Sequence, residues 1–281
     1  MDRKVAQSIA FALLRASGFV VVLPVLLVLY FLISKGWSAI SWDFLTQMPS
    51  NGMTEGGILS PIVGTLYLVF CTTIIALPLG VMSAVYLSEY ARPGRFTRLV
   101  RLAIVNLAGV PSIVYGLFGY GVFVLLLSLG ECILAGSLTL ALLILPVIIV
   151  TAEEALVAVP QTFREASLAL GATKWQTTRR VVLPNALPGI ITGAILGIGR
   201  AAGETAPILF TVAAFWMASL PKSVFDKAMA LPYHLFIMST QVPNAPPRIQ
   251  WGTALTLLII VLGMNLIAAV IRARFRRRRP W

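Results

Sequence analysis

The sequence has few charged residues, two cysteines and a single histidine. Asp, Glu, Lys and Arg make up 11% of the 281 residues, whereas about 25% is usual in soluble globular proteins. Cys71 and Cys132 are far apart and match no metal-binding or redox spacing. These shortages exclude a soluble enzyme, a disordered chain and a nucleic-acid-binding protein.

Long apolar runs make up most of the chain, with 58% hydrophobic residues and a mean hydropathy of +0.91. A helix needs about 20 apolar residues to cross a membrane. Six such runs cover residues 16–34, 62–88, 102–128, 132–152, 187–218 and 253–271. We therefore predict an all-α polytopic membrane protein with six transmembrane helices. Pro207 should kink or break the fifth helix, and Pro111 either bends the third or serves packing alone.

The basic residues are unevenly divided between the two sides of the predicted helices. Of the 22 Lys and Arg residues, 17 fall in segments on one side and four on the other, and Arg200 lies within the fifth run. Because Lys and Arg accumulate on the cytoplasmic side, both termini are expected in the cytoplasm. The N-terminal run lacks a small-x-small cleavage pattern, so we expect a retained signal anchor.

The cytoplasmic loop 153–187 carries the signals of a helix–turn–helix. Pro160 suits the start of a helix, and Thr162 and Glu165 have the spacing of a capping box. A short helix over residues 163–170 should end at Gly171, in the left-handed position that follows many helices.

A second helix follows in the same loop. Thr173 and Gln176 have the spacing of another capping box, which predicts a helix over residues 174–182. Pro184 should end it, and Pro188 should open the next span. From spacing alone, the loop either docks in the groove of a partner or lies on the membrane surface.

Arg200 and Glu204 lie inside the otherwise apolar fifth run. Charges at the middle of a bilayer are costly, so each needs a partner or a wet cavity. One interpretation is an ion pair that locks helices together. The other is an anion pathway, because arginine binds tetrahedral oxyanions well. The residues alone leave both open.

The loop resembles the "EAA" signature of ABC-importer permeases. The similarity rests on Glu165-Ala166-Ser167, Gly171 and Val181-x-Leu183-Pro184, with Ser167 for a third small residue and Val181 for Ile as mild departures. The resemblance implies that the loop is the coupling helix that docks on an ATPase subunit. It implies coupling roles for Thr162, Arg164, Glu165, Ala166, Ser167, Gly171, Leu183 and Pro184.

The fifth run is similar to that of the PstA-type phosphate permeases, over the stretch 199–207 that contains Arg200 and Glu204. This resemblance implies a type I ABC importer permease of MetI-like architecture, in which these two residues belong to the phosphate pathway. It implies a PstC-type permease partner, two PstB-type ATPases and a PstS-type phosphate-binding protein at a bacterial cytoplasmic membrane.

The resemblance also divides the chain. Residues 1–54 would form an N-terminal anchor helix and external loop, 55–272 the transmembrane domain with coupling loop 153–187, and 273–281 a basic cytoplasmic tail. Permeases of other oxyanion importers, for sulfate or molybdate, share the loop and remain an alternative. A membrane enzyme is the other, although the sequence has no nucleotide-binding Gly-x-x-x-x-Gly-Lys loop. We expect no cofactor and no metal here, with ATP and Mg²⁺ on the partner ATPase.

Overall fold

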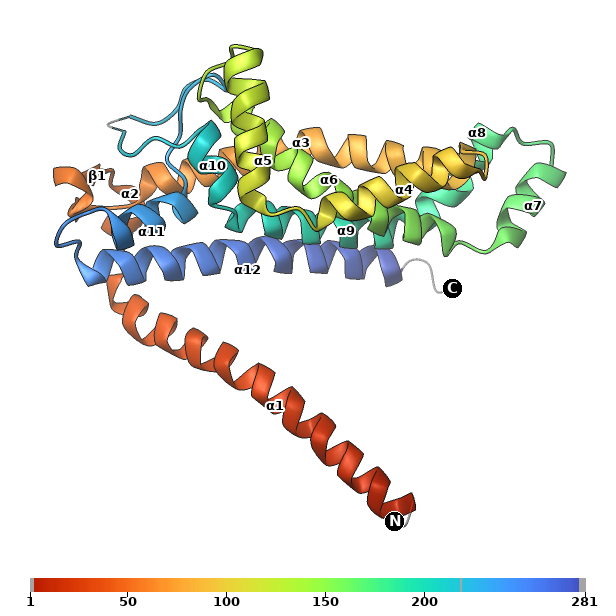
Figure 1. Cartoon of the computed structure of the whole chain (residues 1–281), viewed down its shortest axis with the longest axis horizontal. Helices are drawn as coiled ribbons and strands as arrows, with labels where there is room; N and C mark the ends of the chain where they lie inside the picture. The colour runs from red at the N-terminus through yellow and green to blue at the C-terminus, as the bar shows by residue number, and fades with distance from the viewer. Residues whose placement is uncertain (1–2, 218, 278–281) are drawn as a thin grey trace.

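The computed structural model describes residues 3–217 and 219–277 and shows an elongated bundle of helices (Figure 1). The long helices are α1 (Arg3–Gly36), α3 (Leu59–Val85), α6 (Ile133–Val157), α9 (Leu183–Gly203) and α12 (Pro247–Arg277). The shorter ones are α2 (Trp42–Thr46), α4 (Arg95–Ala108), α5 (Ser112–Gly119), α7 (Gln161–Ala169), α8 (Lys174–Thr177), α10 (Ala206–Thr211) and α11 (Leu231–Thr240).

Irregular turns connect or extend these helices. Two are 3₁₀ turns, η1 (Trp37–Ala39) and η2 (Asn51–Met53), and three are π-helical, η3 (Tyr86–Tyr90), η4 (Tyr120–Leu126) and η5 (Thr178–Val182). Strands β1 (Pro49–Ser50) and β2 (Glu55–Gly56) pair antiparallel in the loop between α2 and α3.

The described residues contain five segments long and apolar enough to cross a membrane, and six if one bent pair counts as a single span. The five are Ala10–Ala39, Leu59–Tyr90, Ile133–Val157, Lys174–Gly203 and Pro247–Arg274. This confirms the all-α polytopic fold. The sixth consists of α4 and α5 with η4, which meet at an angle of 103°, so the third run is not one straight helix. Pro111, whose φ and ψ are −57° and 140°, cannot continue α4 because it lacks an N–H.

The fifth span differs from the prediction at its N-terminal end. α8, η5 and α9 form one continuous span from Lys174, so Pro184 does not end a helix and Pro188 does not open one. Pro184 falls in the first turn after η5, where a π-helical turn changes the hydrogen-bond register and proline is tolerated. At the other end, α9 stops at Gly203 and α10 begins next to Pro207, which confirms the predicted break.

α6 forms the centre of the bundle, between α3 and α9 (Figure 1). Two-thirds of its most apolar window is buried within the chain. α9 approaches it through small residues, because a Cβ at Gly193 would fall only 1.8 Å from the hydroxyl of Thr151. Small residues at four-residue spacing allow this close approach of two membrane helices.

α1 behaves differently from the other long helices. It diverges from the bundle (Figure 1), and none of its most apolar window is buried within the chain. It touches α12 near its C-terminal end, where Gly36 lies against Trp251 and Leu255. α1 therefore has an apolar surface that the described residues do not cover.

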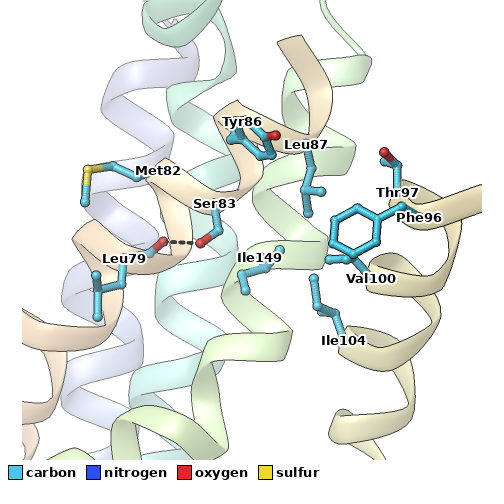
Figure 2. A pocket seen from close by; sticks show the side chains of 10 residues that line it. All are labelled: Leu79, Met82, Ser83, Tyr86, Leu87, Phe96, Thr97, Val100, Ile104 and Ile149. Atoms are coloured by element: carbon cyan, nitrogen blue, oxygen red, sulfur yellow. Dashed lines mark hydrogen bonds between the residues drawn. The ribbon is translucent and has the colours of Figure 1, made fainter. Parts of the chain in front are cut away.

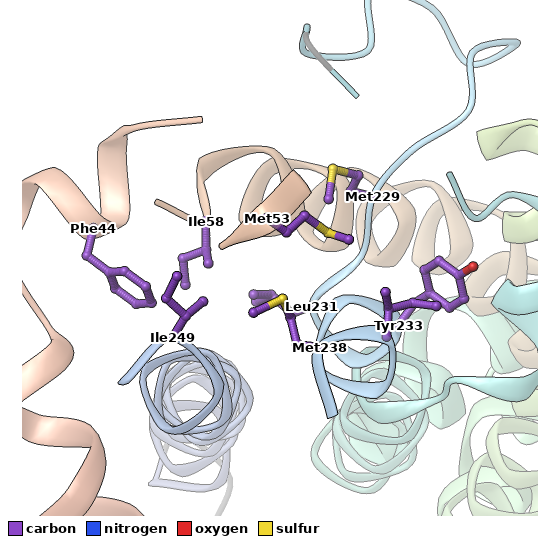
Figure 3. Packing of buried hydrophobic residues seen from close by; sticks show 9 residues of the cluster. Phe44, Met53, Ile58, Met229, Leu231, Tyr233, Met238 and Ile249 are labelled. Carbon is purple, nitrogen blue, oxygen red and sulfur yellow. The ribbon is translucent and has the colours of Figure 1, made fainter. Parts of the chain in front are cut away.

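The two ends of the bundle carry different structures. At one end, α2, η2, α11 and the start of α12 enclose an apolar cluster (Figure 3). The cluster contains Phe44, Met53, Ile58, Met229, Leu231, Tyr233, Ile237, Met238 and Ile249. α7 and α8 lie at the opposite end, toward which the first turn of α1 and the last turn of α12 also point (Figure 1).

Candidate coupling surface and charged pairs

The first helix of loop 153–187 begins earlier than the sequence suggested. Pro160 is the N-cap residue of α7, with extended backbone angles and no side-chain cap. Thr162 is thus already the second helical residue, so the capping box of Thr162 with Glu165 is wrong. Pro160 and Thr162, two residues apart, are both typical of a helix start. The helix begins directly after Pro160, because the fixed φ of proline suits the entry to a helix.

The end of α7 is as predicted. Gly171 has a φ of +82°, its N–H donates to Leu168 at 2.9 Å, and the N–H of Ala172 donates to Ser167 at 3.2 Å. These two bonds make a Schellman motif, which satisfies carbonyls at the end of the helix. The chain therefore turns sharply after α7.

The second capping box is confirmed. The Thr173 N–H donates to Oε1 of Gln176 at 2.8 Å, and the Gln176 N–H donates to Oγ1 of Thr173 at 3.3 Å. α7 and α8 thus form the predicted helix–turn–helix, with α8 continuing into the fifth span.

α7 has one face toward the bundle and one face away from it. Phe163 packs against the apolar cluster of α6 and α9, and Ser167 Oγ lies 2.9 Å from Thr177 Oγ1. The exposed residues of α7 include Thr162, Glu165 and Ala166. Leu183 and Pro184 are half-buried at the start of α9, so the eight predicted coupling residues do not share one surface.

Three large apolar side chains extend the exposed face of the loop. Leu168, Leu170 and Trp175 are 48%, 90% and 57% exposed. We call this surface, together with Glu165 and Ala166, the loop patch. Trp175 was missed by the sequence analysis, although a tryptophan directly after a predicted helix start in a cytoplasmic loop was a visible signal.

Arg164 points toward the bundle and binds Glu89. Like Trp175, Glu89 was not among the residues predicted from the sequence. Nη2 of Arg164 lies 2.7 Å from Oε1 of Glu89, and Nε donates to the same carboxylate at 3.2 and 3.3 Å. Nη1 and Nη2 also donate to the carbonyls of Val159 and Leu156 at 2.7 and 2.8 Å. An acidic residue just after an apolar run was the only local signal for Glu89.

The Arg200–Glu204 pair has a looser geometry. Nε of Arg200 donates to Oε1 of Glu204 at 3.2 Å, and the side chains are 32% and 17% exposed. Glu204 caps α9 with extended backbone angles, so the pair spans the point where the fifth span breaks. An arginine before a glutamate is the weaker order on a helix, and here the break brings the two groups together.

Arg200 lies level with the middles of neighbouring helices. Gly197, one turn earlier, faces Ile144 and Ile148 of α6, and Gly199 faces Asn265 of α12. A charge at this depth is expensive in hydrocarbon. Among the described residues, the Glu204 carboxylate is the ion-pair partner of Arg200, and the arginine side chain is also partly exposed.

Metal chemistry finds no support in the described part of the chain, where no three His, Cys, Asp or Glu side chains are grouped to hold an ion. His234 is 2% exposed on α11, and neither ring nitrogen has a hydrogen-bond partner among the described residues. Burial lowers its pKa to about 4, so its ring is neutral at pH 7.

Comparison with known proteins agrees with this architecture. The sequence is 39% identical over 287 residues to phosphate transport system permease protein PstA 1 of Mycobacterium tuberculosis, covering 100% of this chain and 92% of the relative. The fold is similar to that of an inward-facing MetNI methionine ABC transporter, with a TM-score of 0.58, 21% identity and coverage of 78% and 94%. It is also similar to a bacterial ABC transporter that imports alginate, with a TM-score of 0.67, 14% identity and coverage of 97% and 99%.

Residues 76–279 match the family described as binding-protein-dependent transport system inner membrane component. This range includes α7, α8 and the Arg200–Glu204 pair. The relative from Mycobacterium tuberculosis, which is 39% identical over the whole chain, supports the same family assignment. The chain belongs to the family of inner membrane components of binding-protein-dependent transport systems.

Proposed function

We propose that this chain is a permease subunit of an ATP-driven inorganic phosphate importer and forms half of its translocation pathway. The proposal is supported by relatives that are named phosphate transport system permeases and that match the chain over nearly their whole length. A protein of this class does no chemistry on its substrate, and we assign ATP and Mg²⁺ to a separate ATPase subunit.

The observation that carries the proposal is the Arg200–Glu204 pair. The guanidinium is one-third exposed at mid-depth and makes a single bond to its carboxylate. Arginine offers several fixed donors that suit a tetrahedral oxyanion. Glu204 would hold Arg200 while the path is empty and release it to a passing phosphate, so that the arginine is never an unpaired charge.

The loop patch suits an ATPase partner. It combines apolar side chains with the carboxylate of Glu165 on two short helices, α7, which ends in a Schellman motif, and α8, which begins with a capping box. An amphipathic helix placed in a groove is a common mode of docking. We propose two PstB-type ATPases, a PstC-type permease partner and a PstS-type phosphate-binding protein, with both termini of this chain in the cytoplasm of a bacterium.

The direct test measures uptake of labelled phosphate into vesicles that contain the whole importer. Arg200→Gln should reduce uptake to the level of vesicles without this chain, while the ATPases still co-purify. Arg248→Gln is the matched control, because Arg248 is an exposed arginine at the start of α12 and its loss should leave uptake unchanged.

Competition identifies the substrate in the same assay. Unlabelled phosphate should suppress uptake, whereas sulfate and molybdate at equal concentration should not. Suppression by sulfate or molybdate alone would refute the phosphate assignment. Normal uptake by the Arg200→Gln variant would refute the role of Arg200, and failure of that variant to assemble would favour the helix-lock interpretation.

A further inference from the structure

The cytoplasmic end of the second span is held by two arginines from other helices. This end is η3, a π-helical turn that follows α3. Arg101 of α4 donates from Nη2 to the carbonyl of Leu87 at 2.9 Å, and Arg164 of α7 binds the carboxylate of Glu89. π-helical turns are rare and occur frequently at functional sites.

Free space lies on two sides of η3. An apolar groove of about 450 Å³ between α3 and α4 is lined in part by Tyr86 and Leu87 (Figure 2). A more polar cavity of about 640 Å³ next to α7 is lined in part by Ser88, Glu89 and Arg164. Both are open to the surface, so η3 is not enclosed by close-packed side chains on these two sides and has room to move.

α7 lies at the edge of the bundle (Figure 1). None of its residues is fully buried, and the cavity of about 640 Å³ lies beside it. Phe163 packs on the bundle, and Ser167 meets Thr177 of α8, which continues into the fifth span. The contact of Arg164 with Glu89 joins residues 75 positions apart, and it connects α7 to the second span.

This contact has the geometry of a rigid joint. The guanidinium uses Nε and Nη2 on the carboxylate and gives two further bonds to carbonyls at the end of α6. The side chains of Arg164 and Glu89 are 13% and 8% exposed. Bonds of a planar guanidinium to a carboxylate are strong and directional. α7 therefore cannot shift relative to η3 while these bonds are in place.

We propose that Glu89 is a positioning residue that, through Arg164, transmits the movement of α7 to α3 and α6. This inference rests on the proposed function, in which an ATPase binds the loop patch. Closure of the ATPase would move α7, and the Glu89–Arg164 joint would move the ends of two spans with it. The cavities beside η3 allow that movement without a clash.

The chain offers a matched control in the other arginine. Arg101 lies 2.6 Å from Glu153 and also bonds to η3, but its side chain is 48% exposed and its partners are in α6 and η3, not in α7. Loss of Arg101 removes an ion pair of the same kind from the same end of the bundle and leaves the connection to α7 intact.

The experiment uses the whole importer in proteoliposomes and measures three quantities: ATPase co-purification, ATP hydrolysis, and phosphate imported per ATP hydrolysed. In Glu89→Gln, co-purification should persist while phosphate imported per ATP falls about ten-fold, within the usual range of coupling between two sites. Glu89→Asp keeps the charge on a shorter side chain and should give an intermediate ratio. Arg101→Gln should match the wild type.

The outcomes separate the joint from a merely structural role. An unchanged ratio in Glu89→Gln would overturn the proposal, as would an equal loss in Arg101→Gln. Loss of ATPase co-purification in both Glu89 variants would also overturn it, because the pair would then build the docking surface instead of transmitting its motion. A wild-type importer that hydrolyses ATP but imports no phosphate would refute the proposed substrate, and the ratio would then be measured with the oxyanion that competes.

Discussion

Two arginine–glutamate pairs in this chain have the same chemistry and opposite construction. Arg164 and Glu89 come from distant elements, form three bonds between them and are 13% and 8% exposed. Arg200 and Glu204 are four residues apart, share one bond and are 32% and 17% exposed. The first pair is built to hold two elements together. For the second pair, we propose that Arg200 exchanges Glu204 for the anion.

The strongest test of this difference compares stability after loss of each arginine. Arg164→Met leaves the Glu89 carboxylate buried and unpaired, which should cost about 3–5 kcal/mol of unfolding free energy. Arg200→Met should cost clearly less than Arg164→Met, since both members of its pair are more exposed and share a single hydrogen bond. Unfolding of the purified chain in detergent by denaturant measures both. Equal losses would remove the distinction between a holding and an exchanging pair.

His234 extends the comparison to a buried ionisable group with no partner. Its folded pKa of about 4 lies below the usual value of about 6.5. Between these values the unfolded chain binds more protons, so this contribution to stability is fully present above pH 6.5 and is lost as the pH falls toward 4. The unfolding free energy should be about 2 kcal/mol lower at pH 5 than at pH 7.5 from this residue alone.

The control for that prediction is His234→Gln, which cannot titrate. The pH dependence of the wild type minus that of the variant isolates the histidine from the carboxylates of the chain. A difference near zero would mean that the His234 ring has a polar partner in the folded protein in detergent. His234 would then be a partnered ionisable group, like the members of the two arginine–glutamate pairs.

Several local features could be predicted from neighbouring residues. The Thr173–Gln176 box, the left-handed Gly171 and the break near Pro207 each depend on a few adjacent positions, and each is present. The coupling and pathway roles of the predicted site residues stay predictions. Features that depend on distant residues were out of reach, above all Glu89, whose partner is 75 positions away.

The errors arose where two local rules competed. Pro160 and Thr162 both signalled a helix start, and the earlier residue prevailed. Pro184 and Pro188 signalled a stop between two helices, but packing of α9 along α6 and the π-helical η5 kept the helix continuous. The expected effect of proline applies to an isolated helix. In the folded chain, tertiary contacts decide whether proline bends a helix or ends it.

Gly171 gives a test of the turn that orients the loop patch. Gly171→Val places a β-branched residue at a φ of +82°, which should cost about 1–2 kcal/mol because the left-handed region is strained for such side chains. ATPase co-purification should fall, since α7 and α8 would lose their relative orientation.

Gly94→Val is the matched control for this turn. Gly94 precedes α4 with φ and ψ of −178° and 174°, and a Cβ there meets no atom within 4 Å. Co-purification should be unaffected in this variant. Normal co-purification in Gly171→Val would mean that the Schellman motif does not orient the loop patch. The Glu89–Arg164 pair would then be the contact that fixes the position of α7.

The smallest effect on stability is expected from Glu204→Gln. It removes the charge that faces Arg200 but keeps an amide acceptor at the same position, so the unfolding free energy should change by less than about 1 kcal/mol, as for other partly exposed pairs. Phosphate uptake should nevertheless change, because an arginine that is no longer held would bind the anion more tightly and release it more slowly. Half-saturation should therefore occur at lower phosphate, and the maximal rate should fall. A higher half-saturation concentration would contradict the exchange of partners, since it would mean that Glu204 assists binding of the anion instead of competing with it for Arg200.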